Sequence, residues 1–189
     1  AMLATAYLGK APEKVARAIL LEPGFFTSDE AQDWMEKAKP YMSGLGFYKQ
    51  AAIIAFQSLH VSGPDARAGQ DYMMSELIHE FANHPENPYH CPDKNFDAPA
   101  WRFGATASQT ASQTSAGEID LIAQGAQRYS GPVLLLAGAC NDWIGEDAQR
   151  AHLDFFQRGE LMIVPNAGHD MLWDNPDETL PLIRAFLGE

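Results

Sequence analysis

Two stretches near the end of the chain decide its fold: Gly131-Pro-Val-Leu-Leu-Leu-Ala-Gly-Ala-Cys-Asn-Asp142 and Leu161-Met-Ile-Val-Pro-Asn-Ala-Gly-His169. Each is a short apolar run, typical of a buried strand, that ends at small residues and then presents a polar side chain. In an open parallel sheet, functional groups sit just past the carboxyl ends of the strands. We therefore expect Asp142 and His169 to lie side by side.

A carboxylate beside a histidine suits general-base catalysis, because it orients the imidazole and stabilises its charged form. Asp142 is the predicted acid of this pair and His169 the predicted base. Glu146 is an alternative acid about one helical turn later, where we expect the first turn of a helix. The nucleophile that such a pair would activate has to be found elsewhere.

The remaining residues alternate between strand-like and helical patterns, with a helical block in the middle. We expect strands at 15–21, 133–137 and 161–164, the first ended by Glu22-Pro-Gly24. The expected helices cover 1–8, 31–41, 47–60, 70–81, 119–129, 146–158 and 177–187. Residues 83–92 contain three prolines and should be irregular, and 106–115 is either a flexible loop or a weak helix. This order predicts a short parallel α/β sheet flanked by helices, with an inserted helical cap.

Composition excludes several classes of protein. A hydrophobic content of 46% in 189 residues is typical of a globular protein with a sizeable core. The net charge of -12 argues against nucleic acid binding, which needs clustered Lys and Arg. No apolar run approaches the roughly 18 residues that cross a bilayer. We therefore expect neither a nucleic acid nor a membrane partner.

The cysteines and histidines give little sign of a disulfide or a metal site. Cys91 and Cys140 are the only cysteines, and we expect both to be reduced because a single pair is no disulfide framework. The spacing of His84, His90 and Cys91 fits no recognised zinc motif, so we expect no metal and no cofactor. The first residues lack a basic segment followed by a long apolar run, which predicts a cytoplasmic location.

The order strand-Asp142, helix, strand, Ala-Gly-His169, helix resembles the C-terminal half of the α/β-hydrolase fold, whose triad runs Ser, Asp or Glu, then His. His169-Asp-Met-Leu-Trp-Asp-Asn-Pro176 and the helical cap are most similar to proline iminopeptidases. The resemblance implies a core formed by 1–26 and 116–189, with a cap at 27–115. It assigns Asp142 as the triad acid and His169 as the base.

The Gly-x-Ser-x-Gly motif that carries the nucleophile in this family is absent from the chain, where it would stand directly before Ala1. No serine present has the flanking glycines, and Cys140, although close to Asp142, is not at the family's nucleophile position. The resemblance therefore implies a fragment of a serine hydrolase that is inactive alone, truncated from or split off a longer protein.

Substrate recognition is assigned to side chains near the site and in the cap. Trp143 and Trp173 adjoin the predicted catalytic residues and could line an apolar pocket. Glu76 and Glu80 share one face of a cap helix, and by resemblance to aminopeptidases they could hold a substrate's α-amino group. A solvated acidic face is the simpler interpretation of the two glutamates.

The resulting hypothesis is a proline iminopeptidase-like serine hydrolase acting on a peptide or small-molecule substrate. Alternatives are an esterase or carbon–carbon bond hydrolase of the same fold, and a non-catalytic binding or assembly module. The first strand would have an unpaired edge without the preceding half of the sheet, and the helix at 1–8 would lack its cover. Exposed edges of this kind favour pairing between chains, which predicts a homo-oligomer.

Overall fold

A computed structural model describes residues 1–63, 65–84, 86–92 and 114–188. The chain divides into two compact units. The first comprises Ala1–Trp34, Pro88–Lys94 and Ser115–Glu189, and the second comprises Met35–Asn87 and Asn95–Thr114. The predicted core boundaries, 1–26 and 116–189, fall inside the first unit, which additionally takes residues 27–34 and the segment from Pro88.

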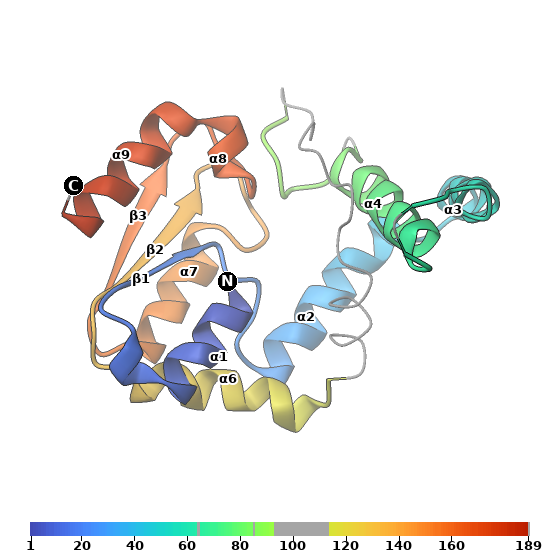
Figure 1. Cartoon of the computed structure of the whole chain (residues 1–189). Helices are drawn as coiled ribbons and strands as arrows, with labels where there is room; N and C mark the ends of the chain where they lie inside the picture. Colours follow the sequence, from blue (N-terminus) through green and yellow to red (C-terminus); the bar gives the residue numbers. More distant parts are fainter. Residues whose placement is uncertain (64, 85, 93–113, 189) are drawn as a thin grey trace. The chain divides into compact units, whose positions relative to one another are not determined.

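The first unit is built on a three-stranded parallel sheet in the order β1-β2-β3 (Figure 1). The strands are β1 (Ala18–Leu21), β2 (Val133–Gly138) and β3 (Gly159–Val164). Ala18 aligns with Val133, which in turn aligns with Gly159. All six residues of β2 are buried, as a central strand covered on both faces requires. The expected parallel α/β fold is confirmed, although β1 begins three residues later than predicted.

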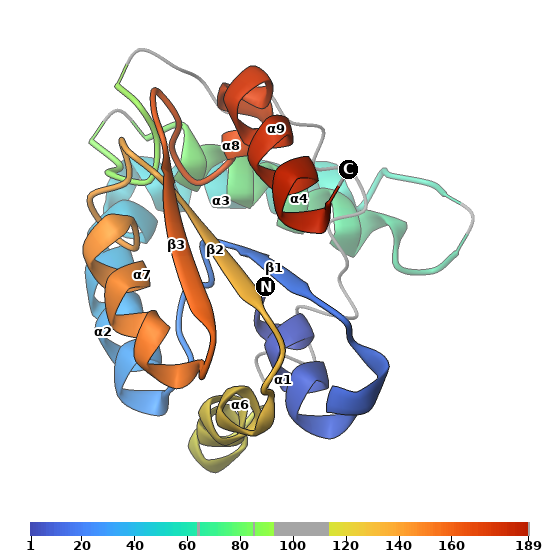
Figure 2. The same cartoon turned by 90° about the vertical axis from the view of Figure 1, so that its left-hand side faces the viewer.

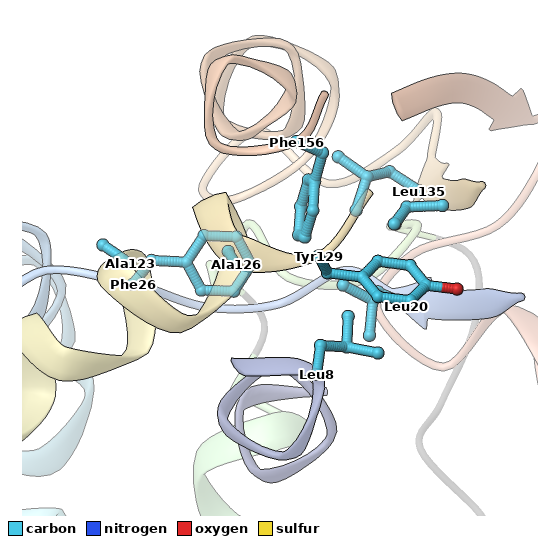
Figure 3. Packing of buried hydrophobic residues seen from close by; sticks show 9 residues of the cluster. Leu8, Leu20, Phe26, Ala123, Ala126, Tyr129, Leu135 and Phe156 are labelled. Atoms are coloured by element: carbon cyan, nitrogen blue, oxygen red, sulfur yellow. The ribbon is translucent and has the colours of Figure 1, made fainter. Parts of the chain in front are cut away.

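One face of the sheet is covered by helices α1 (Met2–Lys10), α6 (Ala116–Arg128) and α7 (Glu146–His152), the last continued by a 3-10 turn (Leu153–Phe155). Leu8, Leu20, Tyr129, Leu135 and Phe156 meet in the core on this side (Figure 3). The helix predicted over 146–158 is too long, because α7 ends at His152 and its 3-10 turn ends at Phe155. The opposite face is covered by α8 (Met171–Asp174) and α9 (Pro176–Leu187) (Figure 2).

Side chains alternate along β2 between these two cores, as the two-residue repeat of a strand dictates. Val133 and Leu135 point into the first core, and Leu134 and Leu136 into the second. Asn175 caps α9, its side chain accepting the N–H of Glu178. The predicted closing helix is thus confirmed, and α8 is an additional short helix directly after His169.

Helix α1 packs against α6 through a contact between two glycines. A Cβ atom on Gly9 would lie 2.1 Å from the Cα of Gly125, so the two backbones touch. Gly9 lies inside α1, which extends to Lys10, two residues beyond the helix predicted over 1–8. The outer side of α1 is open to solvent, since Leu3 is 84% exposed.

The second unit contains α3 (Leu45–Ser58), α4 (Ala68–Ala82) and the end of α2 (Ser28–Ala38), which is continued by a 3-10 turn (Lys39–Met42). These helices match the three predicted over 31–41, 47–60 and 70–81. Helices α3 and α4 pack on each other. The described residues of 83–92 form no helix or strand, as their prolines predicted, and residues 106–113 lie outside the described chain.

The structure joins Cys91 to Cys140 in a disulfide, so the prediction of two reduced cysteines is wrong. The reason lies in the path of the chain, since residues 88–91 run beside the loops that follow β2 and β3. The N–H of Asp142 donates to the carbonyl of Pro88, and the N–H of His169 donates to the carbonyl of Tyr89. Disulfides persist mainly in oxidising compartments, and the cytoplasmic location stays a prediction.

In the described part of the chain, no helix combines the length and the apolar character needed to cross a bilayer.

Candidate functional site

The candidate site lies at the carboxyl ends of the three strands, where each strand is followed by a polar residue. Glu22 follows β1, Asn141 and Asp142 follow β2, and His169 follows β3. The sequence-based rule that functional groups sit at strand ends applies to all three strands.

The carboxylate partner of His169 is Glu22. Nδ1 of His169 donates a hydrogen bond to Oε2 of Glu22 at 2.9 Å. The Glu22 side chain is 0% exposed and that of His169 is 35% exposed. A buried carboxylate of this kind fixes the proton of the neutral ring on Nδ1, which leaves Nε2 of His169 with a lone pair that can accept a proton.

Asp142 does not occupy the position predicted for it. Its side chain is exposed, and its backbone N–H is the group that reaches Pro88. The residue before it, Asn141, is buried and donates from Nδ2 to Oε2 of Glu22 at 2.8 Å. The turn after β2 therefore points Asn141 inward and Asp142 outward, so Glu22 is the residue paired with His169 and Asp142 is not.

Glu22 adopts an unusual backbone conformation, with φ of 40°. Left-handed φ values are uncommon outside glycine, and they concentrate at functional sites where neighbouring contacts hold them. Here the N–H of Glu22 donates to the carbonyl of Leu136, and its Oε1 accepts the N–H of Gly138 at 2.6 Å. The sheet thus holds both the backbone and the side chain of Glu22.

Glycines allow the loops to approach so closely. A Cβ atom on Gly138 would lie 2.3 Å from the carbonyl oxygen of Gly168. One on Gly168 would lie 2.5 Å from the carbonyl oxygen of Tyr89. The exit loops of β2 and β3 and the segment around Tyr89 are therefore packed backbone against backbone, which fixes His169 in place.

Tyr89 and two tryptophans form an aromatic wall beside His169. The Tyr89 ring lies edge-on to the His169 ring, with centroids 4.8 Å apart. Trp34 donates from Nε1 to the Tyr89 hydroxyl at 2.6 Å. Its ring stacks on that of Trp143, with ring centroids 5.4 Å apart. Burial raises the pKa of Tyr89, so this hydroxyl stays neutral. Tyr89 was not predicted as a site residue.

A cavity of about 380 Å³ opens beside His169. Its lining is mostly apolar and aromatic: Ala1, Met2, Leu3, Leu21, Glu22, Pro23, Gly24, Phe25, Trp34, Tyr89 and His169. The N-terminal end of α1 therefore faces the same cavity as the Glu22–His169 pair. Trp143 contacts Trp34 and Tyr89 but does not itself line the cavity.

The other predicted site residues lie away from this cavity or in the second unit. Trp173 is 58% exposed on α8 and does not line the cavity. Glu146 is exposed and pairs with Arg150 on α7. Glu76 and Glu80 lie on α4 of the second unit. Their predicted role in holding a substrate amine stays a proposal.

Histidine 90 adjoins the site but forms no metal centre there. Its Nδ1 lies 3.7 Å from Oδ2 of Asp170. Burial lowers the pKa of His90 and raises that of Asp170, each opposed by the other's charge. Within the described residues, no group of three or more His, Cys, Asp or Glu side chains is placed to hold a metal ion.

The three-stranded parallel sheet, the helices on both of its faces and the strand-end loops that bring Glu22 and His169 together are the features of an α/β-hydrolase fold. The sequence matches the α/β-hydrolase fold family over residues 1–176. The chain therefore belongs to the α/β-hydrolase fold family.

Solved structures with the same fold include several enzymes. MGS-M2, an α/β-hydrolase enzyme from a Medee basin deep-sea metagenome library, is 17% identical with a TM-score of 0.52, over 100% of this chain and 62% of its own. Est816, described as an N-acyl homoserine lactone degrading enzyme, is 18% identical with a TM-score of 0.52. The match covers 98% of this chain and 63% of Est816. A probable hydrolytic enzyme from Pseudomonas aeruginosa PAO1 is 16% identical with a TM-score of 0.52, over 98% and 60%.

At these identities the likeness shows the fold alone. The chain spans less than two thirds of the length of each of these three proteins. The predicted family is confirmed, while the narrower resemblance to proline iminopeptidases, and to the C-terminal half of the fold, stays a prediction.

Proposed function

We propose that this chain carries the base and the acid of a hydrolase that works by acyl transfer from a serine nucleophile. His169 would take the serine proton at Nε2 and return it to the leaving group, and Glu22 would stabilise the imidazolium. The observation that carries the proposal is the 2.9 Å bond from His169 Nδ1 to the buried Oε2 of Glu22, at the edge of a cavity.

The nucleophile is inferred to come from a residue outside 1–189. In this family it sits on a Gly-x-Ser-x-Gly turn between a strand and the helix that follows. Helix α1 has its N-terminal end in the cavity, since Ala1 and Met2 line it together with His169. A serine in the turn before α1 would face the base. The chain alone is then expected to be inactive.

The finer proposal is a proline iminopeptidase-like peptidase that releases an N-terminal residue. It rests on the resemblance of the residues after His169 and on the helical insertion. Glu76 and Glu80 are the carboxylates proposed to hold the substrate's α-amino group, by analogy with aminopeptidases. Their removal should raise KM for aminoacyl substrates only.

A carboxylester hydrolase is the second candidate, and the cavity lining favours it. Among the described lining residues the only carboxylate is Glu22, which His169 and two other donors already engage. An apolar, aromatic lining suits an uncharged acyl group better than an ammonium group. A carbon–carbon bond hydrolase and a non-catalytic assembly module are the remaining alternatives.

The first test is the reading frame upstream of the codon for Ala1, combined with assays of the isolated chain. We expect an in-frame Gly-x-Ser-x-Gly sequence there, and no fluorophosphonate labelling of residues 1–189. A start codon without that sequence would support the assembly module. Stoichiometric labelling of the isolated chain would contradict an external nucleophile.

The second test compares two carboxylate variants in the longer gene product. Glu22→Gln should lower kcat about a thousandfold or more, because the base loses its orienting charge. Asp142→Asn, the matched control, should change kcat by less than about twofold. The reverse ranking would assign the acid to Asp142. Parallel assays with prolyl arylamides and short-chain esters, on wild type, Glu76→Gln and Glu80→Gln, separate the peptidase from the esterase.

A further inference from the structure

Asn141 uses both ends of its side chain, and the two ends have different partners. Its Oδ1 accepts the N–H of Trp143 at 2.9 Å and that of Ile144 at 3.0 Å. Its Nδ2 donates to Oε2 of Glu22 at 2.8 Å. Because both backbone partners are donors, the atom facing them must be the oxygen, and the amino group must face Glu22.

The Glu22 carboxylate is held at three points. Oε1 accepts the N–H of Gly138, and Oε2 accepts both the amide of Asn141 and Nδ1–H of His169. Without the amide, Oε2 would be held only by the imidazole that it is meant to orient. The carboxylate group could then rotate about its terminal side-chain bond, which has a broad torsional preference.

We propose that Asn141 is a positioning residue, which orients the Glu22 carboxylate so that it fixes the proton of His169 on Nδ1. The inference rests on the proposed function for its catalytic meaning. What it predicts is which nitrogen of the neutral His169 ring carries the proton. That can be measured whether or not the chain is an active hydrolase. Asn141 is not among the residues that line the cavity beside His169.

The buried Glu22 carboxylate explains why position 141 carries an amide and not a second carboxylate. A carboxylate at 141 would place two negative groups within hydrogen-bond distance inside the fold, which is unfavourable without a shared proton. The chain has its amide at the inward-facing position and its carboxylate, Asp142, at the exposed one. The order Asn-Asp at the end of β2 thus matches the presence of an acid at the end of β1.

The test measures the tautomer of His169 by ¹⁵N NMR on the chain labelled at histidine, at a pH where the ring is neutral. Wild type should show Nδ1–H. Asn141→Ser keeps a side-chain oxygen for the turn but cannot reach Glu22, and it should shift the ratio of Nδ1–H to Nε2–H about tenfold toward Nε2–H. A ratio unchanged from wild type would overturn the proposal.

The matched control is Asn175→Ser. Asn175 also accepts a backbone N–H with its oxygen and donates from Nδ2 to a carbonyl, that of Pro165. Its side chain bonds to Pro165 and Glu178 and not to Glu22, so the substitution should leave the tautomer of His169 unchanged. An equal shift of the tautomer ratio in both variants would mean that the loss of any such asparagine side chain changes the His169 tautomer. This result would also overturn the proposal.

A second measurement decides the matter if Asn141→Ser does not fold. Asn141→Asp keeps the acceptor for Trp143 and Ile144 but turns the group facing Glu22 into a carboxylate. Its stability relative to Asn175→Asp should fall as the pH rises from about 4 to about 7, because two facing carboxylates then ionise. Parallel pH profiles for the two variants would contradict the contact. A chain that shows the tautomer shift but has no upstream serine would refute the proposed function only.

Discussion

Glu22 combines a left-handed backbone with a side chain that accepts three hydrogen bonds. Each feature is costly by itself, since the conformation is disfavoured and a buried carboxylate needs donors. The residue also precedes a proline, Pro23, which restricts its backbone further. The sheet supplies the missing support through Leu136 and Gly138.

His90 gives the chain a pH dependence of stability. Burial lowers its pKa below the ordinary 6.5, although the charge of Asp170 acts in the opposite direction. Below pH 6.5 the unfolded chain therefore binds a proton that the folded chain resists, so stability should fall as the pH drops through this range. His90→Gln should flatten the slope of unfolding free energy between pH 6.5 and 5, measured by urea denaturation.

The exposed His60 provides the control for that experiment, because it is a histidine that lies outside the core. His60→Gln is expected to leave the slope as in wild type. A slope that survives His90→Gln would assign the acid sensitivity to other groups.

At the scale of elements, the contact between α1 and α6 depends on having no side chain at Gly9. Gly9→Ala would place a methyl group 2.1 Å from the Cα of Gly125, and overpacking of this kind costs about 1–3 kcal/mol or more. Gly117→Ala, in the exposed first turn of α6, meets nothing within 4 Å and should stabilise the chain by up to about 1 kcal/mol. In thermal unfolding, Gly9→Ala should lower the midpoint temperature and Gly117→Ala should raise it. Equal changes in the two variants would contradict the close packing of α1 on α6.

The disulfide is the covalent link that holds the segment of Tyr89 to the exit loop of β2. Cys91 and Cys140 are 49 residues apart, a loop whose closure is worth about 2–4 kcal/mol. The double variant Cys91→Ser/Cys140→Ser should therefore lower the unfolding free energy by that amount. Dithiothreitol should destabilise wild type similarly and leave the double variant unaffected. A response of the double variant to dithiothreitol would point to another cause.

The sequence predicts elements better than it predicts the partners within the site. Apolar runs and helical spacing predicted all three strands and most helices, because these patterns report burial directly. The prediction that Asp142 pairs with His169 was wrong for a geometric reason. Which of Asn141 and Asp142 points inward depends on the turn after Gly138. The signal for Glu22 was present, as a polar residue directly after an apolar strand. The disulfide could not be predicted, since it depends on where an irregular, proline-rich segment lies.

At the scale of the whole molecule, association between copies stays a prediction. Strand β1 pairs only with β2 in the described chain, and Leu3 and Tyr7 on the adjacent α1 are 84% and 47% exposed. An open edge beside an apolar face favours pairing. We expect a dimer or larger assembly by light scattering at micromolar concentration. A monomeric mass would contradict it.

A charge on α1 should weaken such an assembly. Leu3→Lys introduces one at a position already exposed, so the fold is retained while the dissociation constant rises about tenfold or more. Leu180→Lys on α9, where Leu180 is 40% exposed, is the control and should leave the mass unchanged. Equal effects of the two lysines would indicate association driven by net charge.

The separation of Glu22 from its partners along the chain has a consequence for the order of folding. Strands β2 and β3 are joined by the short connection that contains α7 and its 3-10 turn, whereas Glu22 is 116 residues from Gly138 and 147 from His169. Long loops close late, because their entropy is lost before the contacts that compensate for it form. The parallel β2-α7-β3 unit should therefore acquire protected amides first, and the docking of β1 should complete the sheet. The carboxylate and the imidazole would then meet only in the last step, so that a partly folded chain has no paired base.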